Sequence, residues 1–313
     1  MKGSVLPNCP DCFTFPEECH GMRIDAALAR CFPSVSRVLV RRSLDAGLIS
    51  SGGLPLRARM PVVAGLRVNI CWVQPRPISL KPKYLALSIL HEDEELLAID
   101  KPPNAVVHPT PLGEKSLVEA VLAHTDGQLS SCAGPNRPGV IHRLDRETTG
   151  ILLFAKTNGA HRMLENQFAS RKVTKTYEAL AAGVPNILSG RVIAPIGRDP
   201  RHRTRMSIAP GGKSARTDWR IRPGGKGNFS HFFLHPHTGR THQIRVHLAS
   251  MGHPILGDEL YGFDGKKYAH FQIPRILLHA STLKFMHPTT GKWLEISAPL
   301  PEDMARLSEE ESE

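Results

Sequence analysis

The sequence predicts an α+β protein with two domains, a small one at the N-terminus and a larger one after it. Three observations lead to this prediction. The chain has 313 residues, enough for one large domain and one small domain. A proline- and lysine-rich stretch at residues 75–84 separates two patterned regions and is typical of an extended linker. The apolar run Ile151–Ala155 follows turn-forming residues and predicts a buried strand in the larger domain.

The two ends of the chain differ in pattern from the regions beside them. Residues 1–21 lack helical apolar spacing, which first appears just after Met22. The last five residues, Glu309–Glu313, are acidic and are expected to be disordered. We therefore expect a flexible tail at 1–21, a small αβ domain at 22–74, the linker at 75–84, the large domain at 85–303 and an acidic tail at 304–313.

The small domain is predicted to contain two helices and short strands. Apolar residues recur at helical spacing over residues 24–31 and stop at Phe32-Pro33. Ser36 is a suitable N-cap for a second helix, which Gly47 would end. Short strand-like pieces follow at 48–49, 57–60 and 66–72.

The large domain is predicted to alternate strands with a few helices. Strands at 85–90 and 96–99 flank an acidic turn, and Ser116 begins a helix that runs to Thr125. The remaining predicted elements are the strand at 151–155, a helix capped by Asn158, a strand at 175–180, a helix at 240–251 capped by Thr241, and a late strand at 277–285.

The composition bounds the class of protein. Lysine and arginine number 40 against 29 acidic residues, which suits a polyanionic partner such as a nucleic acid, although a basic enzyme without such a partner is the alternative. No apolar run approaches the ~20 residues of a membrane span. The N-terminal residues lack the apolar core of a secretory signal, so a cytoplasmic protein is expected.

The cysteines leave one metal hypothesis open. Cys9, Cys12, Cys19 and His20 could form a zinc knuckle, because thiolates two residues apart can share one tetrahedral ion. The alternative, which we favour, is a set of free thiols in a flexible tail. We therefore predict no metal.

A charged segment precedes the strand at 151–155. The stretch Gly139–Gly150 holds five ionisable residues, namely His142, Arg143, Asp145, Arg146 and Glu147. Charges beside a core strand cost several kcal/mol unless they are paired or have a function. Their presence therefore indicates a functional site at the start of this strand. A structural ion pair in a surface loop is the alternative, and the charge pattern alone does not decide between them.

Two motifs in this region resemble those of a known family. The string His-Arg-Leu-Asp-x-x-Thr-Thr-Gly at 142–150 is similar to the signature of the RluA-type pseudouridine synthases, and Gly239–His247 resembles their second motif. The resemblance covers roughly residues 22–300. It implies the pseudouridine synthase fold, with a mixed, mainly antiparallel central sheet flanked by helices. It also implies that the small domain is of the S4 type, an RNA-binding domain named after a ribosomal protein.

The resemblance implies an isomerase that converts uridine to pseudouridine and requires neither redox chemistry nor a cofactor. Asp145 takes the place of the catalytic aspartate, which either attacks the ribose or removes a proton from it. Arg245 would keep this carboxylate ionised, and Tyr177 would stack on the target base or pass a proton. The target nucleotide must be flipped out of its helix, and Arg143 would hold the vacated space or the neighbouring backbone.

The expected substrate is structured RNA. Arg37, Arg41 and Arg42 would form a phosphate-facing ridge on the second helix of the small domain. The large domain would add a second group of basic residues, namely Arg198, Arg203, Arg205 and Lys213. Family members with an S4-type domain act mostly on large-subunit ribosomal RNA, which is the favoured substrate, and transfer RNA is the alternative. A monomer is expected.

Two other functions compete with this hypothesis. A zinc-dependent base deaminase requires histidine followed two residues later by glutamate, and no histidine of this chain has that neighbour. A non-catalytic RNA-binding protein would fit the basic small domain but would not need Asp145.

Overall fold

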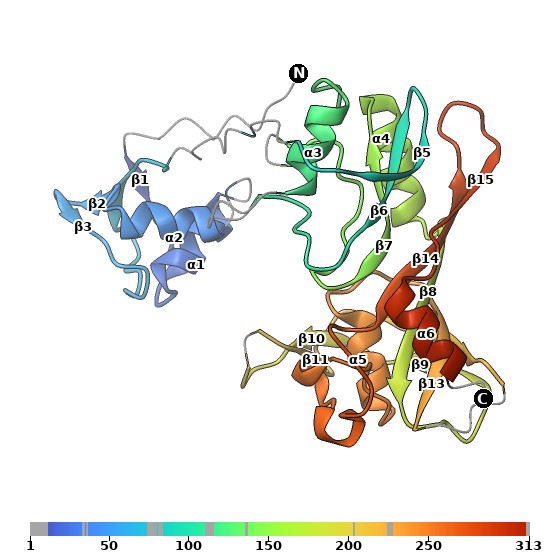
Figure 1. The fold of residues 1–313 in the computed structure, drawn as a ribbon. Coiled ribbons are helices and arrows are strands. Elements are labelled where there is room, and N and C mark those ends of the chain that lie inside the picture. Colours follow the sequence, from blue (N-terminus) through green and yellow to red (C-terminus); the bar gives the residue numbers. More distant parts are fainter. Residues whose placement is uncertain are drawn as a thin grey trace. The chain divides into compact units, whose positions relative to one another are not determined.

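The computed structural model describes residues 12–32, 35, 37–73, 80, 84–109, 116–134, 137–202, 204–223 and 228–310 (Figure 1). The chain divides into two compact units, Met1–Pro77 and Ile78–Glu313. Most of the linker predicted at 75–84, namely residues 75–79 and 81–83, lies outside the described residues. Each unit is considered by itself below.

The first unit packs two helices against a small sheet. Helix α1 (Ile24–Cys31) was predicted by its apolar spacing, and helix α2 (Arg37–Asp45) was predicted by its expected start and end signals. Ser36, the expected cap of α2, is not among the described residues, whereas Gly47 has φ 70° and follows the end of this helix. The sheet has the order β1-β4-β2-β3, with β1 at Phe13–Thr14, β4 at Arg67–Ile70, β2 at Ile49–Ser51 and β3 at Leu54–Pro55.

The expected flexible tail does not extend over residues 12–21. Phe15 and Cys19 are each 1% exposed, and strand β1 pairs with β4. The ring of Phe13 contacts that of Phe32 edge-on at 4.9 Å. These aromatic residues have no helical spacing, so their burial depends on α1 and β4, which lie later in the sequence. Residues 1–11 are not described.

The zinc hypothesis receives no support from the described cysteines. Cys9 lies outside the described part of the chain, and the Sγ atoms of Cys19 and Cys31 are 3.7 Å apart. Among the described residues, no group of three or more His, Cys, Asp or Glu side chains could hold a metal ion.

The second unit is built on a mixed, mainly antiparallel sheet, which confirms the predicted fold class. Within the described residues it has nine strands in the order β5-β6-β7-β14-β8-β13-β12-β9, with β15 paired to β14. The strands are β5 Ser88–Glu92, β6 Leu96–Lys101, β7 Thr149–Ala155, β8 Thr174–Ala182, β9 Ser189–Ile193, β12 Arg216–Ile221, β13 Phe229–Pro236, β14 Leu278–Met286 and β15 Trp293–Ser297. All pairings are antiparallel except that of β7 with β14.

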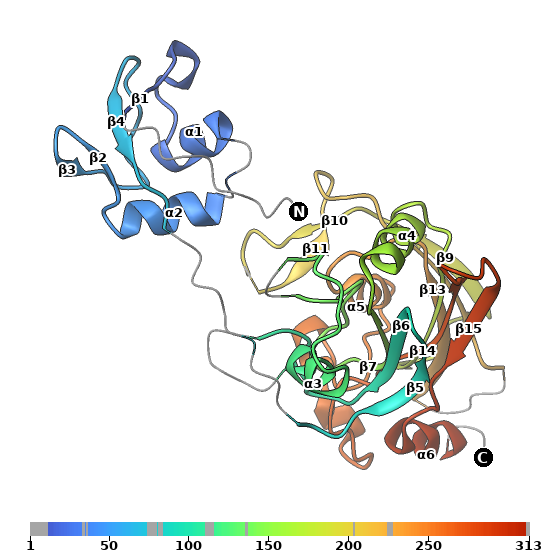
Figure 2. The same ribbon diagram turned by 90° about the horizontal axis from the view of Figure 1, so that it is seen from above.

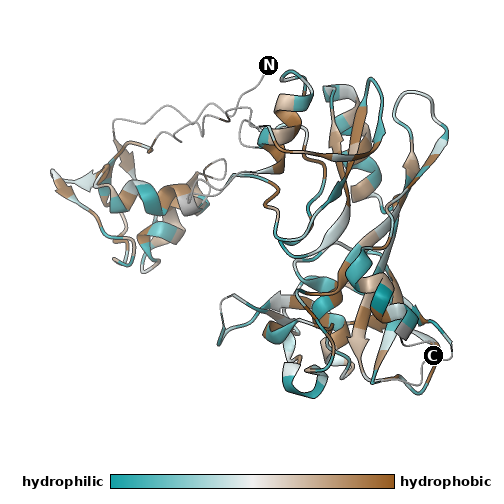
Figure 3. Ribbon diagram, viewed as in Figure 1, coloured by the Kyte–Doolittle hydropathy of each residue, from teal (hydrophilic) through white to brown (hydrophobic). Residues whose placement is uncertain are grey.

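Helices α3 (Leu117–His124) and α4 (Asn158–Ala169) cover opposite faces of the sheet at β6 and β7 (Figure 2). Alternate residues of β6 point to opposite faces: Leu97 packs with α3, and Leu96 packs with α4. Figure 3 colours much of α3 as apolar, in agreement with its burial. Ser116 caps α3 with a complete capping box, as its sequence predicted.

Helices α5 (Gln243–Ser250) and α6 (Glu302–Glu310) repeat this arrangement on β8. Ala179 and Ala181 pack with α5, whereas Leu180 packs with α6. Among the described residues, no helix has both the length and the apolar character that a bilayer span requires.

Helix α6 replaces the acidic tail that was expected from residue 304. Met304 and Leu307, three residues apart, are 0% and 1% exposed. Asp303 also forms a bidentate ion pair with Arg275, with both N–O distances 2.7 Å. Glu302 and Glu309 are exposed, so they lie on the solvent face of an amphipathic helix. Residues 311–313 lie beyond the described part.

Gly150 permits the parallel pairing of β7 with β14. Its φ is +105°, and a Cβ atom at this position would lie 2.3 Å from the carbonyl oxygen of Ala280. Any side chain would therefore separate the two strands. This junction places the loop before β7 beside β8 and α5.

Candidate active site

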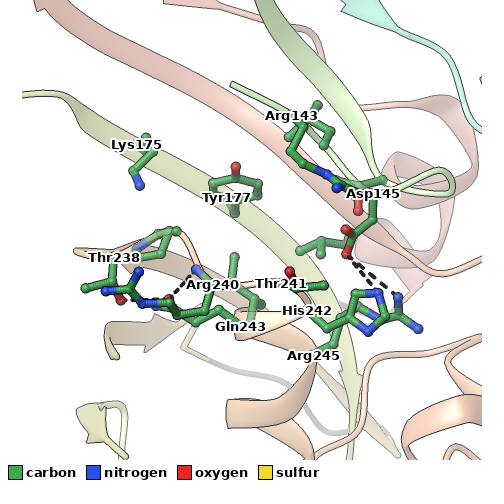
Figure 4. A pocket seen from close by; sticks show the side chains of 16 residues that line it. Arg143, Asp145, Lys175, Tyr177, Thr238, Arg240, Thr241, His242, Gln243 and Arg245 are labelled. Atoms are coloured by element: carbon green, nitrogen blue, oxygen red, sulfur yellow. Dashed lines mark hydrogen bonds and ion pairs between the residues drawn. The ribbon is translucent and has the colours of Figure 1, made fainter. Parts of the chain in front are cut away.

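A pocket of about 130 Å³ lies where the loop before β7 meets β8 and α5 (Figure 4). Asp145, Tyr177, Arg245 and Arg143, all predicted as site residues, line this pocket. Its volume is similar to the roughly 150 Å³ of an engineered protein cavity that binds benzene. The pocket therefore has room for one six-membered ring.

A buried lysine holds the loop that carries Asp145. Lys101, on β6, is 0% exposed and donates hydrogen bonds to the carbonyl oxygens of Pro102, Arg146 and Thr148 at 2.9, 2.7 and 2.8 Å. Two of these carbonyls follow Asp145 in its loop, one and three residues later. The sequence analysis had assigned no role to this lysine.

Replacing Lys101 with methionine is expected to destabilise the protein. Each of the three carbonyl oxygens left unpaired costs about 1–3 kcal/mol, and the removal of a buried charge offsets part of this loss. We expect the free energy of unfolding in urea to fall by about 3 kcal/mol at neutral pH.

The stability lost in the Lys101→Met protein should increase with pH. Burial lowers the pKa of Lys101 from 10.5 to about 8, against the opposing charge of Asp145. Between these values the unfolded chain binds more protons than the folded one, so Lys101 makes the free energy of unfolding rise with pH. The deficit of the Lys101→Met protein relative to wild type should therefore widen between pH 8 and pH 10.5. A constant deficit across this window would contradict the assignment.

His142 has a structural position in the same loop. Its Nε2 accepts a hydrogen bond from the Leu153 backbone N–H at 3.1 Å, and its ring stacks on Phe168. Burial lowers the pKa of His142 to about 3, so the ring is neutral and can act as this acceptor. His142 thus packs the loop and does not line the pocket.

Arg245 faces Asp145 but is oriented by another acid. Its Nη1 lies 3.7 Å from Oδ2 of Asp145, whereas its Nε and Nη2 bind Asp258 at 2.7 and 2.8 Å. Asp258 is 0% exposed. Because Asp258 occupies one edge of the guanidinium, the remaining nitrogen is directed at Asp145. The sequence analysis missed Asp258. Its position directly after the apolar pair Ile255-Leu256 and a glycine could have indicated a buried acid.

A second residue near Asp145 was also missed. Nε2 of His242 lies 3.9 Å from Oδ2 of Asp145, and its Nδ1 is 2.8 Å from the hydroxyl of Tyr261. Burial lowers the pKa of His242, and the charge of Asp145 opposes this effect. The backbone of His242 is left-handed, with φ 54°.

This backbone conformation explains why α5 begins at Gln243 instead of Arg240. The Gln243 side chain accepts hydrogen bonds from the Thr238 hydroxyl at 2.7 Å and from the Arg240 backbone N–H at 3.1 Å (Figure 4). The loop is therefore closed by Gln243, and the cap expected from Thr241 is not formed. The result is a tight turn that brings His242 and Arg245 to the same side of the pocket.

Tyr177 and Lys175 line the pocket from β8. Burial, together with the charge of Asp145, raises the pKa of Tyr177, so its hydroxyl keeps its proton at neutral pH. Such a ring is better suited to stacking than to accepting a proton. Lys175, two residues earlier on the same face, has its pKa lowered by burial to about 8.

The predicted RNA-binding residues fall into two groups. Arg198 ends β10 (Ile196–Arg198), and Arg205 precedes β11 (Met206–Ile208) in a small basic hairpin. Exposed Lys213 pairs through its backbone with Ile196, at the base of this hairpin. Arg203 lies outside the described residues.

The second group lies on α2 of the first unit. Arg41 and Arg42 are exposed. Arg37 is bound to buried Asp25, with N–O distances of 2.9 and 3.2 Å. Arg37 therefore contributes to the fold of this unit, whereas Arg41 and Arg42 are exposed on the same helix.

Comparisons with known proteins agree on one family. The model of the RNA pseudouridylate synthase family matches residues 95–250. An uncharacterized RNA pseudouridine synthase of Aquifex aeolicus is 38% identical over 300 residues, which cover 92% of this chain and 93% of that protein. The ribosomal large subunit pseudouridine synthase D of Zymomonas mobilis is 38% identical over 306 residues, covering 94% and 95%. The solved structure of human RNA pseudouridylate synthase domain containing 1 superposes with a TM-score of 0.56 at 28% identity, covering 72% of this chain and 86% of that one.

Proposed function

We propose that this chain, which belongs to the RNA pseudouridine synthase family, modifies uridines of large-subunit ribosomal RNA in the cytoplasm. The chain is an isomerase that converts uridine in RNA to pseudouridine. Ribosomal RNA is proposed as the substrate because relatives from three bacteria, 37–38% identical over at least 92% of this chain, are named ribosomal large subunit pseudouridine synthase D. Transfer RNA is the alternative.

Asp145 is the proposed catalytic residue. The reaction breaks the bond between ribose C1′ and N1, turns the base over and forms a bond from C1′ to C5. The proton on C5 is lost and N1 gains one, so the overall change is an isomerisation. A carboxylate beside the sugar can either attack C1′ or remove a neighbouring proton. The observation that carries this assignment is the distance of 3.7 Å between Asp145 and Arg245 in a pocket that fits one ring.

The other pocket residues receive roles that follow from their chemistry. Tyr177 stacks on the flipped base, because its ring lines the pocket and its hydroxyl stays protonated. Arg245, held by Asp258, directs a positive charge at the carboxyl group of Asp145. Arg143 is exposed at the same pocket and supports the RNA from which the nucleotide was extruded.

The proposed RNA contacts are electrostatic. Arg198, Arg205 and Lys213 in the second unit, and Arg41 and Arg42 in the first, would bind phosphates without reading sequence. The first unit is proposed to be the S4-type RNA-binding domain. Its small sheet and two helices agree with this proposal, and two of its exposed arginines, Arg41 and Arg42, are adjacent on α2.

Mapping pseudouridines in cellular RNA with and without this gene tests the substrate. We expect one or more pseudouridines of large-subunit ribosomal RNA to disappear in the deletion strain and to return when the wild-type gene is restored. Restoring the gene with the Asp145→Asn change should not return them. Losses confined to transfer RNA would replace the ribosomal proposal with its alternative, and an unchanged map would contradict both.

A further inference from the structure

We propose, building on the function proposed above, that Tyr261 is a positioning residue that ties the basic β10–β11 hairpin to His242 and Arg245. Tyr261 ends a short helical turn, η2 (Glu259–Tyr261), which follows Asp258. It lies outside both sequence motifs and outside the pocket lining. Its side chain is 6% exposed, and it contacts the hairpin on one side and the active site on the other.

Two contacts join Tyr261 to the hairpin. The backbone N–H of Met206, the first residue of β11, donates a hydrogen bond to the Tyr261 hydroxyl at 2.9 Å. The guanidinium carbon of Arg205 lies 5.4 Å from the centre of the tyrosine ring, within the range of a cation–π contact. The hairpin is thus held to Tyr261 by its backbone and by one of the side chains proposed to bind RNA.

Two further contacts join Tyr261 to the active site. Its hydroxyl is 2.8 Å from Nδ1 of His242, and its ring centre is 5.0 Å from the guanidinium carbon of Arg245. His242 and Arg245 each come within 4 Å of Asp145. One ring therefore lies in cation–π contact with guanidinium groups from both the hairpin and the site.

The hydrogen bonds of the hydroxyl also determine the tautomer of His242. Because the hydroxyl accepts a hydrogen bond from Met206, its own proton is available for Nδ1 of His242. A neutral imidazole that accepts at Nδ1 carries its proton on Nε2. Nε2 is the atom that faces Asp145. The hydroxyl of Tyr261 thus presents an N–H group, instead of a lone pair, to the proposed catalytic carboxylate.

The backbone of His242 makes this support necessary. A non-glycine residue in the left-handed region is strained and persists only when its surroundings hold it there. Tyr261 supplies such a contact to the side chain. An RNA that binds the hairpin would therefore stabilise the arrangement of His242 and Arg245 around Asp145 through one shared side chain.

The Tyr261→Phe change tests the role of the hydroxyl, because it keeps the ring and both cation–π contacts. We expect the single-turnover rate at saturating enzyme to fall about tenfold as His242 loses its position. The dissociation constant for RNA should stay within about twofold of wild type, since no phosphate contact is lost. A purely structural role would lower stability and leave this rate unchanged.

Tyr268→Phe is the matched control. The Tyr268 hydroxyl donates to the carbonyl oxygen of Asn228 at 2.8 Å, so this change also removes a buried hydrogen bond, but away from the pocket of Asp145. We expect Tyr268→Phe to keep the wild-type rate. Equal rates for Tyr261→Phe and Tyr268→Phe would overturn the proposal.

A double substitution tests the connection through His242. Asparagine tolerates the left-handed backbone but has no atom at the position of Nε2, so His242→Asn should also lower the rate. If Tyr261 acts through His242, the protein with both changes should be no slower than the slower single variant. Multiplied losses would show two independent effects and would reject the connection.

Asp145→Asn in the same assay separates this inference from the proposed function. An active Asp145→Asn protein would overturn the function proposed for the site, whatever the Tyr261 variants do. An inactive Asp145→Asn protein together with a wild-type rate for Tyr261→Phe would overturn only the role of Tyr261.

Discussion

Replacing Asp145 with asparagine is expected to abolish pseudouridine formation and to leave RNA affinity nearly unchanged. The amide has the shape of the carboxylate but can neither attack ribose C1′ nor accept a proton from the sugar. We expect the rate to fall by about 10³-fold or more. Release of tritium from C5 of the target uridine measures turnover, because that hydrogen leaves when the new bond forms. Equilibrium titration with the same RNA measures affinity.

Glu147→Gln provides the control for this experiment. Glu147 is an acid of the same loop, two residues after Asp145, but it does not line the pocket. The neutral substitution there should leave turnover close to wild type. Equal turnover by the wild-type and Asp145→Asn proteins would refute the proposed mechanism.

Replacing Asp258 with asparagine is expected to lower both stability and turnover. Asp258 is 0% exposed, and it binds Arg245 at two positions. Its loss removes the carboxylate to which the buried guanidinium is hydrogen-bonded, which costs about 3–5 kcal/mol. Arg245 is then free to turn away from Asp145, and a shift of about 1 Å can lower the rate by about 10²-fold. Urea unfolding and single-turnover rates measure the two losses.

Asp303→Asn is the matched variant for stability. Asp303 binds Arg275 with the same bidentate geometry at 2.7 Å, but it joins helix α6 to the segment before β14 and does not line the active-site pocket. This variant should be less stable and, when folded, as active as wild type. If Asp258→Asn also keeps its rate once folded, the orientation of Arg245 is not required for the reaction.

Much of the fold was predictable because its signals are local. The apolar spacing over 24–31 and the capping box at Ser116 each depend on residues a few positions apart, and helices α1 and α3 form there. Helix α6 was missed because the acidic residues at 309–313 led us to predict a disordered tail for the whole segment 304–313. Its apolar face, Met304 and Leu307, has a partner in Leu180, which the sequence does not indicate.

The sequence by itself determined where the charged loop lies and which motif it carries, because the turn-forming residues and the buried run Ile151–Ala155 are neighbours in the chain. Only the tertiary structure decided what holds that loop and its partner arginine. The ammonium group of Lys101 reaches carbonyls 45 and 47 residues away, and Arg245 and His242 depend on Asp258 and Tyr261 in a separate turn. These contacts form because sheet pairing and helix packing bring distant segments together, and no local pattern of residues encodes such distances.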